Sequence, residues 1–152
     1  IAAEGHAIGN HTYWHPNLTE GGVPQLDWEV KETNKVIKKI TGRKTRLFRP
    51  PYGALNDKLA QRLKKMNMNA ILWSVDSENW KEPPAKKMNK IVLNNTSAGD
   101  IILFHDAGDW RLDLSGTLKS LDTIIPKLQK RGYEFVTIPE LLNTPEHFRK
   151  GS

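Results

Sequence analysis

Short apolar runs alternate along this chain with longer segments in which apolar residues recur at helical spacing. The runs that we expect to form strands cover residues 7–10, 46–49, 70–75, 101–104 and 133–138. A strand followed by a helix, repeated in this way, is typical of β/α units whose strands lie parallel in one sheet. The alternation therefore predicts an α/β fold.

The first helical segments have clear boundary signals. One of them carries apolar or β-branched residues at helical spacing and stops at a natural helix-ending glycine, Gly42. Those positions are Leu26, Val30, Thr33, Ile37 and Ile40. Asn56 can cap a second helix with its side-chain oxygen, and Pro83 and Pro84 can open a third.

The last long helix is expected to have Ser115 as its cap and to end at Gly132. Its apolar positions, which share one face, are Leu118, Leu121, Ile124, Ile125 and Leu128. Pro126 lies inside this segment. Because proline removes a backbone donor and clashes with the preceding turn, we expect it to kink the helix or to delay its start.

Composition limits the kinds of protein that this chain can be. It has 152 residues, 38% of them hydrophobic, and we expect residues 1–152 to form a single domain. No run of 18 apolar residues suggests a membrane segment, and the absence of cysteine excludes disulfides and thiolate metal sites. The net charge of +6 favours an anionic partner, but the lysines are scattered over the helices, so we expect no nucleic-acid binding.

The first residues are unusual for the start of a β/α domain. Residues 1–5 are typical of the last turn of a helix that a glycine closes. A closed barrel of β/α units usually needs about 250 residues. We therefore expect that an N-terminal piece of the same protein is missing from this sequence or exists as a separate fragment that accompanies it.

Polar residues stand at the ends of four consecutive expected strands. His11 follows the first strand, Arg49 ends the second, Asp76 follows the third and His105 follows the fourth. Parallel strands bring their carboxyl ends to the same rim, which is where α/β folds place their active sites. Random placement would scatter such residues, so the coincidence indicates a catalytic site.

His11 and His15 have the spacing H-x-x-x-H, which can bring two imidazoles together on one turn. Pro16 prevents His15 from continuing as a helix, so the pair should lie on a loop. A pair of surface histidines is the simpler alternative, but its place after a strand favours a metal site. Zinc normally takes a third protein ligand, and in hydrolases this is commonly a carboxylate.

Four ordered motifs resemble those of one enzyme family. Residues 9–16 (GNHTYWHP), 48–53 (FRPPYG), 76–80 (DSENW) and 103–106 (LFHD) are similar to motifs two to five of the polysaccharide deacetylases. These are the NodB-homology domains of carbohydrate esterase family 4. Residues 130–138 resemble the family's last helix and strand. The resemblance implies a distorted (β/α) barrel, of which this chain lacks the N-terminal unit or units.

The family's first motif, T-F-D-D-G, does not occur in this sequence. In the family its first aspartate is the catalytic base and its second is the third metal ligand. The resemblance therefore implies that His11 and His15 bind a divalent metal, by expectation Zn²⁺, together with an aspartate from the N-terminal piece. Arg49 would orient the base.

The remaining roles implied by the resemblance concern catalysis and substrate binding. Tyr52 would donate its backbone N–H to the oxyanion of the tetrahedral intermediate. His105 would be the general acid, with Asp76 holding its imidazole. Leu103 and Trp80 would line the pocket for the acetyl methyl group. Trp14 and Trp110 are candidates for stacking on sugar rings, whereas His6 and His147 are expected to be exposed and without a role.

The expected reaction is removal of N-acetyl groups from a GlcNAc-containing polysaccharide, with peptidoglycan ahead of chitin oligomers. An acetylxylan esterase on the same fold is an alternative. So is a non-catalytic carbohydrate-binding domain, if the first-motif aspartates are truly absent. The resemblance also implies a bacterial protein that is extracellular or associated with the cell wall.

Overall fold

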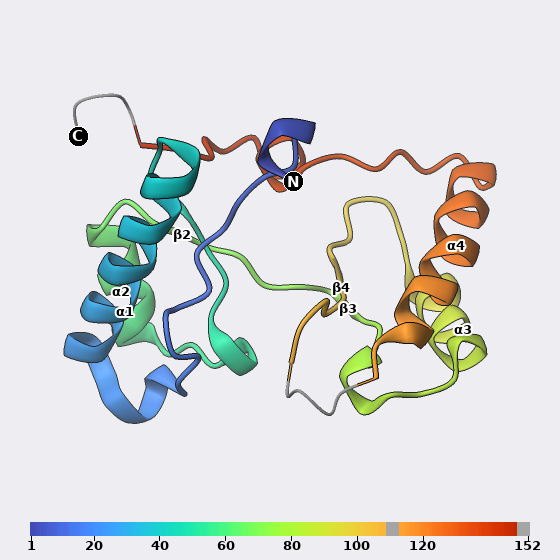
Figure 1. The fold of residues 1–152 in the computed structure, drawn as a ribbon, viewed down its shortest axis with the longest axis horizontal. Helices are drawn as coiled ribbons and strands as arrows, with labels where there is room; N and C mark the ends of the chain where they lie inside the picture. Colours follow the sequence, from blue (N-terminus) through green and yellow to red (C-terminus); the bar gives the residue numbers. More distant parts are fainter. Residues whose placement is uncertain (109–112, 149–152) are drawn as a thin grey trace. The chain divides into compact units, whose positions relative to one another are not determined.

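The computed structural model describes residues 1–108 and 113–148. It divides into two compact units (Figure 1). The first unit comprises residues 1–72 together with 137–152, and the second comprises residues 73–136. Each unit contains parallel strands and helices, as the alternation of the sequence predicts.

The strands of the first unit are short and parallel. β1 (Leu47–Phe48) pairs with β2 (Asn69–Ala70), and Asn10 forms a parallel bridge with Phe48. The expected strand over residues 7–10 is therefore reduced to its last residue. Before it, the 3₁₀ turn η1 (Ala2–Glu4) ends at Gly5, which adopts φ 85°, in agreement with the expected helical turn closed by glycine.

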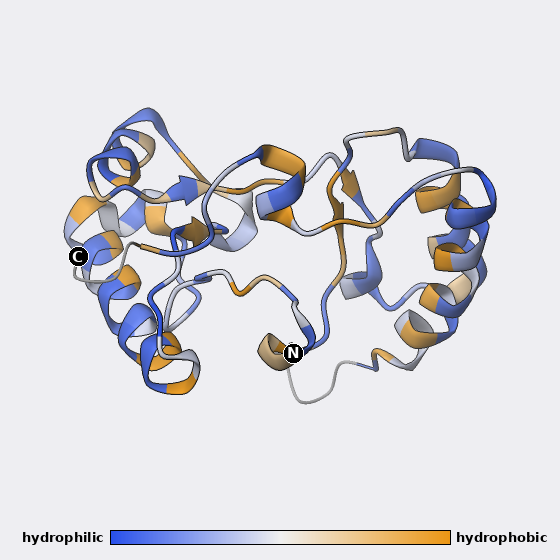
Figure 2. Cartoon of the chain, turned by 90° about the horizontal axis from the view of Figure 1, so that it is seen from above, coloured by the Kyte–Doolittle hydropathy of each residue, from blue (hydrophilic) through white to orange (hydrophobic). Residues whose placement is uncertain are grey.

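Two helices supply the core of the first unit. α1 (Leu18–Thr41) is interrupted at Gly22, which has non-helical backbone angles, and α2 (Asp57–Lys65) begins after the side-chain cap of Asn56. Their apolar faces bury one cluster with the strand residue Phe48. Its buried members are Leu18, Leu26, Val30, Phe48, Leu59, Leu63 and Met68. Figure 2 shows that hydrophobic and hydrophilic residues alternate along the helices.

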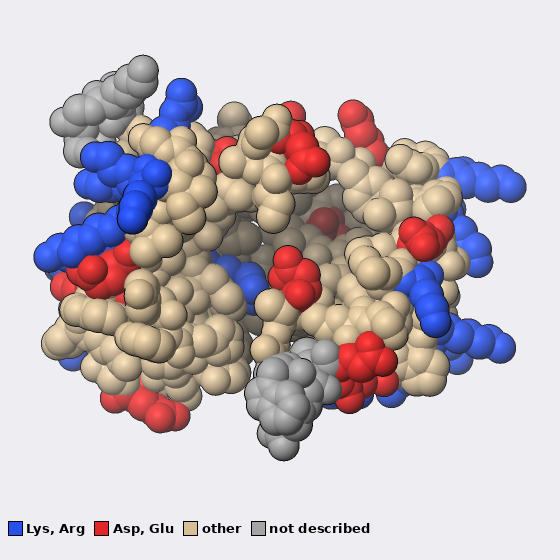
Figure 3. Space-filling view, viewed as in Figure 1, with Lys and Arg blue, Asp and Glu red and all other residues tan. Residues whose placement is uncertain are grey.

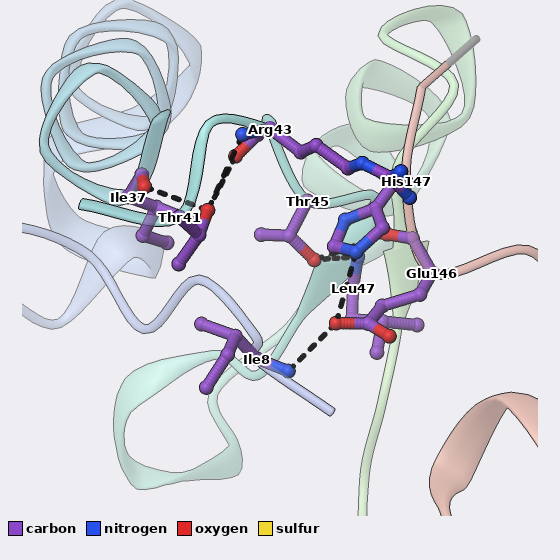
Figure 4. A network of polar contacts seen from close by, with 8 residues as sticks. All are labelled: Ile8, Ile37, Thr41, Arg43, Thr45, Leu47, Glu146 and His147. Carbon is purple, nitrogen blue, oxygen red and sulfur yellow. Dashed lines mark hydrogen bonds and ion pairs between the residues drawn. The ribbon is translucent and has the colours of Figure 1, made fainter. Parts of the chain in front are cut away.

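The C-terminal segment of the first unit pairs with the residues that precede β1. After the short helix α5 (Ile138–Leu142), His147 forms an antiparallel bridge with Thr45. The Glu146 carboxylate accepts a hydrogen bond from the backbone N–H of Ile8 at 2.9 Å (Figure 4). The expectation that His147 is exposed is wrong, because this pairing leaves its side chain only 24% exposed. His6 is exposed, as expected.

The second unit pairs β3 (Val75–Asp76) with β4 (Ile102–Leu103) in parallel. A 3₁₀ turn, η3 (Asn79–Lys81), follows β3, and the helices α3 (Ala85–Asn95) and α4 (Ser115–Lys130) pack together. The buried core cluster consists of Val75, Val92, Ile124 and Leu128. As expected, α3 begins after the proline pair and α4 ends close to Gly132.

Several predictions for the strands and helices of this region are wrong. Residues 133–137 are not a strand, and Ile138 begins α5 instead. Residues 70–75 contain the end of β2 and the start of β3, with no strand between them. Ser115 is the first helical residue and not the cap, and α4 continues through Pro126. Apolar and β-branched residues favour strands, but a strand also needs a neighbouring strand to pair with its backbone.

The charged side chains are scattered over the surface that Figure 3 shows, as the sequence predicts for the lysines. On the face that Figure 3 shows, lysine and arginine side chains protrude over the helices with acidic side chains among them. Over residues 1–108 and 113–148, no helix is long and apolar enough to cross a membrane.

Candidate active site

His11 and Arg49 stand side by side because they follow paired parallel segments. The backbone N–H of Asn10 donates to Leu47 at 2.8 Å, and that of Arg49 donates back to Asn10 at 2.9 Å. Each residue then leaves its strand or bridge at the same end. The rim predicted from the sequence therefore exists in the first unit.

The two histidines of the H-x-x-x-H motif face each other. Their ring centroids are 4.9 Å apart, and the rings meet edge to face at 78°. Nδ1 of His11 lies 2.6 Å from the carbonyl oxygen of Arg49, a contact that requires the N–H on Nδ1 and, in a neutral ring, places the lone pair on Nε2. Metal-binding histidines are commonly held in this way by a backbone carbonyl. Within the described part of the chain, no three His, Asp or Glu side chains come close enough to hold a metal.

Tyr52 extends this group of rings. It lies in the 3₁₀ turn η2 (Pro51–Gly53) with left-handed backbone angles, φ 59° and ψ 6°. Its ring centroid is 4.8 Å from that of His15, and its hydroxyl donates to the His15 carbonyl at 3.4 Å. Proline on the N-terminal side restricts the backbone of this loop, so Tyr52 is placed beside the histidine pair.

Trp14 is strongly exposed, at 72%, and meets Tyr13 edge to face at 5.1 Å. Such an exposed ring is available for contact with a ligand. Trp110, the other candidate for sugar stacking, lies outside the described residues.

In the second unit, the parallel pairing of β3 and β4 places Asp76 opposite Leu103. Leu103 is buried, and the Asp76 carboxylate accepts the backbone N–H of Glu78 at 2.8 Å. Trp80 is half exposed, and Nζ of Lys81 lies 4.8 Å from its ring centroid. Lys81 also donates a hydrogen bond to Glu78, which holds the pKa of that carboxyl below its ordinary value.

Asn79 is the residue that sequence reasoning missed. It is 1% exposed, and its Oδ1 lies 2.9 Å from Nδ1 of His105. Its Nδ2 donates to the His105 carbonyl at 2.8 Å and to the Thr117 hydroxyl at 2.9 Å. This amide joins the loop after β3 to the loop after β4 and to α4. The expected role of Asp76 toward His105 stays a prediction. Asn79 belongs to the motif over residues 76–80, but the resemblance assigned it no role.

The site residues thus form two groups. His11, His15, Arg49 and Tyr52 belong to the first unit, together with Trp14. Asp76, Trp80, Leu103 and His105 belong to the second. Asp76 and Leu103 end the strands β3 and β4, and the other residues lie in the segments that follow a strand or bridge, which is where α/β folds place their active sites.

Several known proteins similar to this chain are named as deacetylases. A sequence model of the family described as polysaccharide deacetylase matches residues 1–71. A peptidoglycan-N-acetylglucosamine deacetylase of Bacillus cereus is 35% identical over 144 residues, which are 95% of this chain and 52% of the relative. A chitooligosaccharide deacetylase of Azorhizobium caulinodans is 35% identical over 147 residues, with 90% of this chain and 69% of the relative covered. The chain thus spans about half of the first relative's length.

Solved structures agree with these relatives. The Bc1960 peptidoglycan N-acetylglucosamine deacetylase, crystallised with a hydroxamate-type benzamide, matches with a TM-score of 0.93 and 34% identity, covering 97% of this chain and 68% of that one. A carbohydrate esterase family 4 pseudoenzyme from Bacillus anthracis matches with a TM-score of 0.80 and 33% identity, covering 89% of this chain and 46% of that one. With its α/β fold of the NodB-homology type, this chain belongs to the polysaccharide deacetylase family.

Proposed function

We propose that the intact protein is a metal-dependent hydrolase that removes N-acetyl groups from a GlcNAc-containing polysaccharide, with peptidoglycan as the first candidate substrate. The observation that carries the proposal is the edge-to-face pair of His11 and His15, with Nδ1 of His11 held by the Arg49 carbonyl. The names of the relatives support peptidoglycan first and chitin oligomers second.

The histidine pair fits two of the three protein ligands that catalytic zinc usually has. His11 would bind through Nε2, since its Nδ1 is engaged by a carbonyl, and His15 would contribute its own ring. By the family resemblance, the aspartates of T-F-D-D-G, on a further segment of the same protein, supply the third ligand and the catalytic base. When bound there, a divalent metal such as Zn²⁺ supplies Lewis-acid polarisation of the amide carbonyl.

The residues of this chain divide the remaining tasks of amide hydrolysis. Tyr52 offers its backbone N–H to the developing oxyanion, from a loop that prolines restrain. Arg49 orients the aspartate base. His105 donates the proton that the leaving amine needs, since an amine departs readily only after protonation. Leu103 and Trp80 contact the acetyl methyl group, and Trp14 stacks on a neighbouring sugar.

Acetate release by the intact protein tests this function. The substrates are purified peptidoglycan, N-acetylated chitin oligomers and acetylxylan, each before and after treatment with a chelator. We expect acetate from the N-acetylated polymers, loss of release on chelation, and recovery with Zn²⁺. Release only from acetylxylan would favour the esterase alternative on the same fold.

A second candidate function is carbohydrate binding without catalysis. It is favoured by the likeness to a pseudoenzyme of the same family, which retains the fold. Sequencing of the complete protein decides whether the two aspartates of the first motif are present. If they are absent, we expect binding to the polymers without acetate release.

The proposed substrate also suggests where the protein acts. Hydrolysis of a wall polymer requires that the enzyme reaches the wall, so we propose an extracellular or wall-associated bacterial protein. Fractionation of the source cells, with detection by antibody, tests this location.

A further inference from the structure

A buried carboxylate on α1 contacts the loop that carries the two histidines. Glu29 is 2% exposed. Its Oε2 accepts hydrogen bonds from the backbone N–H of Tyr13 at 2.6 Å and of Trp14 at 2.9 Å. These two residues lie between His11 and His15, so a single oxygen holds the middle of the H-x-x-x-H turn.

The turn has a conformation that its own residues do not favour. Thr12 has φ 67° and His15 has φ 56°, and neither is glycine. Histidine adopts the left-handed region more readily than most residues, but a β-branched residue such as threonine seldom does, and such conformations persist only where surrounding contacts hold them. Within the loop, the Thr12 hydroxyl accepts the backbone N–H of His15 at 3.0 Å, and the contacts from Glu29 add to this local support.

The same turn of α1 supports the loop at a second point. The carbonyl of Val30, next to Glu29, accepts a hydrogen bond from Nδ2 of Asn10 at 3.0 Å. Oδ1 of Asn10 then accepts the backbone N–H of Thr12, also at 3.0 Å. Asn10 is fully buried. Neighbouring positions of one helix thus hold the backbone on both sides of His11.

We propose that Glu29 is a positioning residue for metal binding. By accepting two backbone N–H groups, its carboxylate keeps the turn in the conformation in which the His11 and His15 rings meet at 4.9 Å. The proposal rests on the proposed role of these histidines as metal ligands. Neither the motif nor the family resemblance assigns Glu29 a role, because it lies 14 residues beyond His15 on the helix.

The experiment compares three variants of the intact protein. Glu29→Leu removes the oxygen that accepts both hydrogen bonds, and Glu29→Gln removes the charge but keeps one oxygen that can accept both N–H groups. Glu32→Leu is the matched control, since Glu32 lies on the same helix and pairs with Lys35 near the surface. Zinc affinity is measured by competition with a chromophoric chelator, and amide hydrogen exchange is measured in the metal-free protein.

We expect Glu29→Leu to bind zinc about 10- to 100-fold more weakly, the usual effect of losing a group that supports a metal ligand. The amides of Tyr13 and Trp14 should exchange faster in this variant, while Glu29→Gln and Glu32→Leu should keep near-normal zinc affinity. Unchanged zinc affinity in Glu29→Leu would overturn the proposal. So would an equal loss in Glu29→Gln, because the negative charge and not the acceptor geometry would then matter.

A further variant keeps the test decisive if Glu29→Leu does not fold. Glu29→Asp retains the charge but withdraws the carboxylate by one methylene, so we expect weaker zinc binding than in Glu29→Gln. Equal, near-normal affinity in both would contradict the positioning role. Because zinc affinity is measured without substrate, a protein that binds zinc but releases no acetate would contradict the proposed function and not this inference.

Discussion

The Oδ1 atom of Asn79 lies 2.9 Å from Nδ1 of His105 and 3.1 Å from the backbone nitrogen of the same residue. A carbonyl oxygen only accepts hydrogen bonds, so this contact holds the imidazole with its proton on Nδ1. The other ring nitrogen, Nε2, is then the atom that can exchange a proton with a substrate. The neutral amide of Asn79 thus holds the expected general acid at Nδ1.

The Asn79 contact predicts the direction of a pH effect. In Asn79→Asp, a negative charge replaces the amide next to the imidazole, which favours the protonated ring and raises its pKa. Since a general acid must be protonated, the alkaline limb of the kcat profile should move to higher pH. Asn79→Leu, which cannot accept the hydrogen bond, serves as the comparison. An unchanged alkaline limb in Asn79→Asp would contradict the assignment.

Asp76 was expected from the family resemblance to hold the same imidazole. If it does, Asp76→Asn removes a nearby negative charge and lowers the pKa of His105, so the alkaline limb should move to lower pH. The pH–rate profile of this variant, measured beside that of Asn79→Asp, separates the two roles. A limb that stays in place excludes Asp76 as the tuning group.

His105→Ala should lower kcat by about 10²-fold or more, the usual range for the loss of an acid catalyst. Zinc content should stay near that of the unaltered protein, because His105 belongs to a different loop from the histidine pair. The two readouts are steady-state kinetics and elemental analysis of the same sample. Loss of zinc in this variant would make His105 a ligand and not an acid.

His11→Ala and His15→Ala should each lose most of the bound zinc. Each variant leaves two of the three proposed protein ligands, and two ligands hold a catalytic metal weakly. His6→Ala is the matched control, because His6 is exposed and precedes the bridge at Asn10. Elemental analysis after dialysis gives the metal content of all three. Near-stoichiometric zinc in either His11→Ala or His15→Ala would rule out that ligand.

Adjacent isoleucines in α4 test the core of the second unit. Ile124 is 1% exposed within the cluster formed with Val92 and Leu128, whereas Ile125 is 38% exposed. Ile124→Ala should lower the free energy of unfolding by about 2–5 kcal/mol. Ile125→Ala should lower the free energy of unfolding by less, because it leaves a smaller cavity. Urea unfolding of the intact protein measures both. Equal losses would contradict the packing of α4.

The first turn of α4 predicts an effect of pH on stability. The Asp113 carboxylate accepts the backbone N–H of Ser115 at 2.8 Å, which holds the pKa of Asp113 below its ordinary value of 3.8. The contribution of the ionised Asp113 carboxylate to the free energy of unfolding is therefore present above pH 3.8. It is lost as the pH falls through the lower pKa that Asp113 has in the folded protein. The difference in Tm between the unaltered protein and Asp113→Ala should shrink below pH 3.8. The difference in Tm between Asp113→Asn and Asp113→Ala, neither of which titrates at this position, should change less with pH.

Local signals in the sequence predicted the helices better than the strands. The Asn56 cap, the proline pair before α3 and the Gly42 end all act through nearby backbone groups, and the structure confirms them. The strand expected over residues 133–138 was wrong, because strand formation depends on a distant partner segment. Pro126 was expected to disturb α4, but the helix continues, and its packing against α3 stabilises it.

The sequence by itself determined the parallel α/β class, the family and the places of His11, Arg49, Asp76 and His105 at or near the end of a strand or bridge. These follow from periodicity and from short motifs, which need no knowledge of distant contacts. Only the tertiary structure decided that Asn79 holds His105 and that Glu29 holds the histidine turn. Both contacts join residues 15 or more positions apart, and their hydrogen bonds depend on how the chain packs. An asparagine or a glutamate in a sequence carries no sign of burial, so packing alone could reveal them.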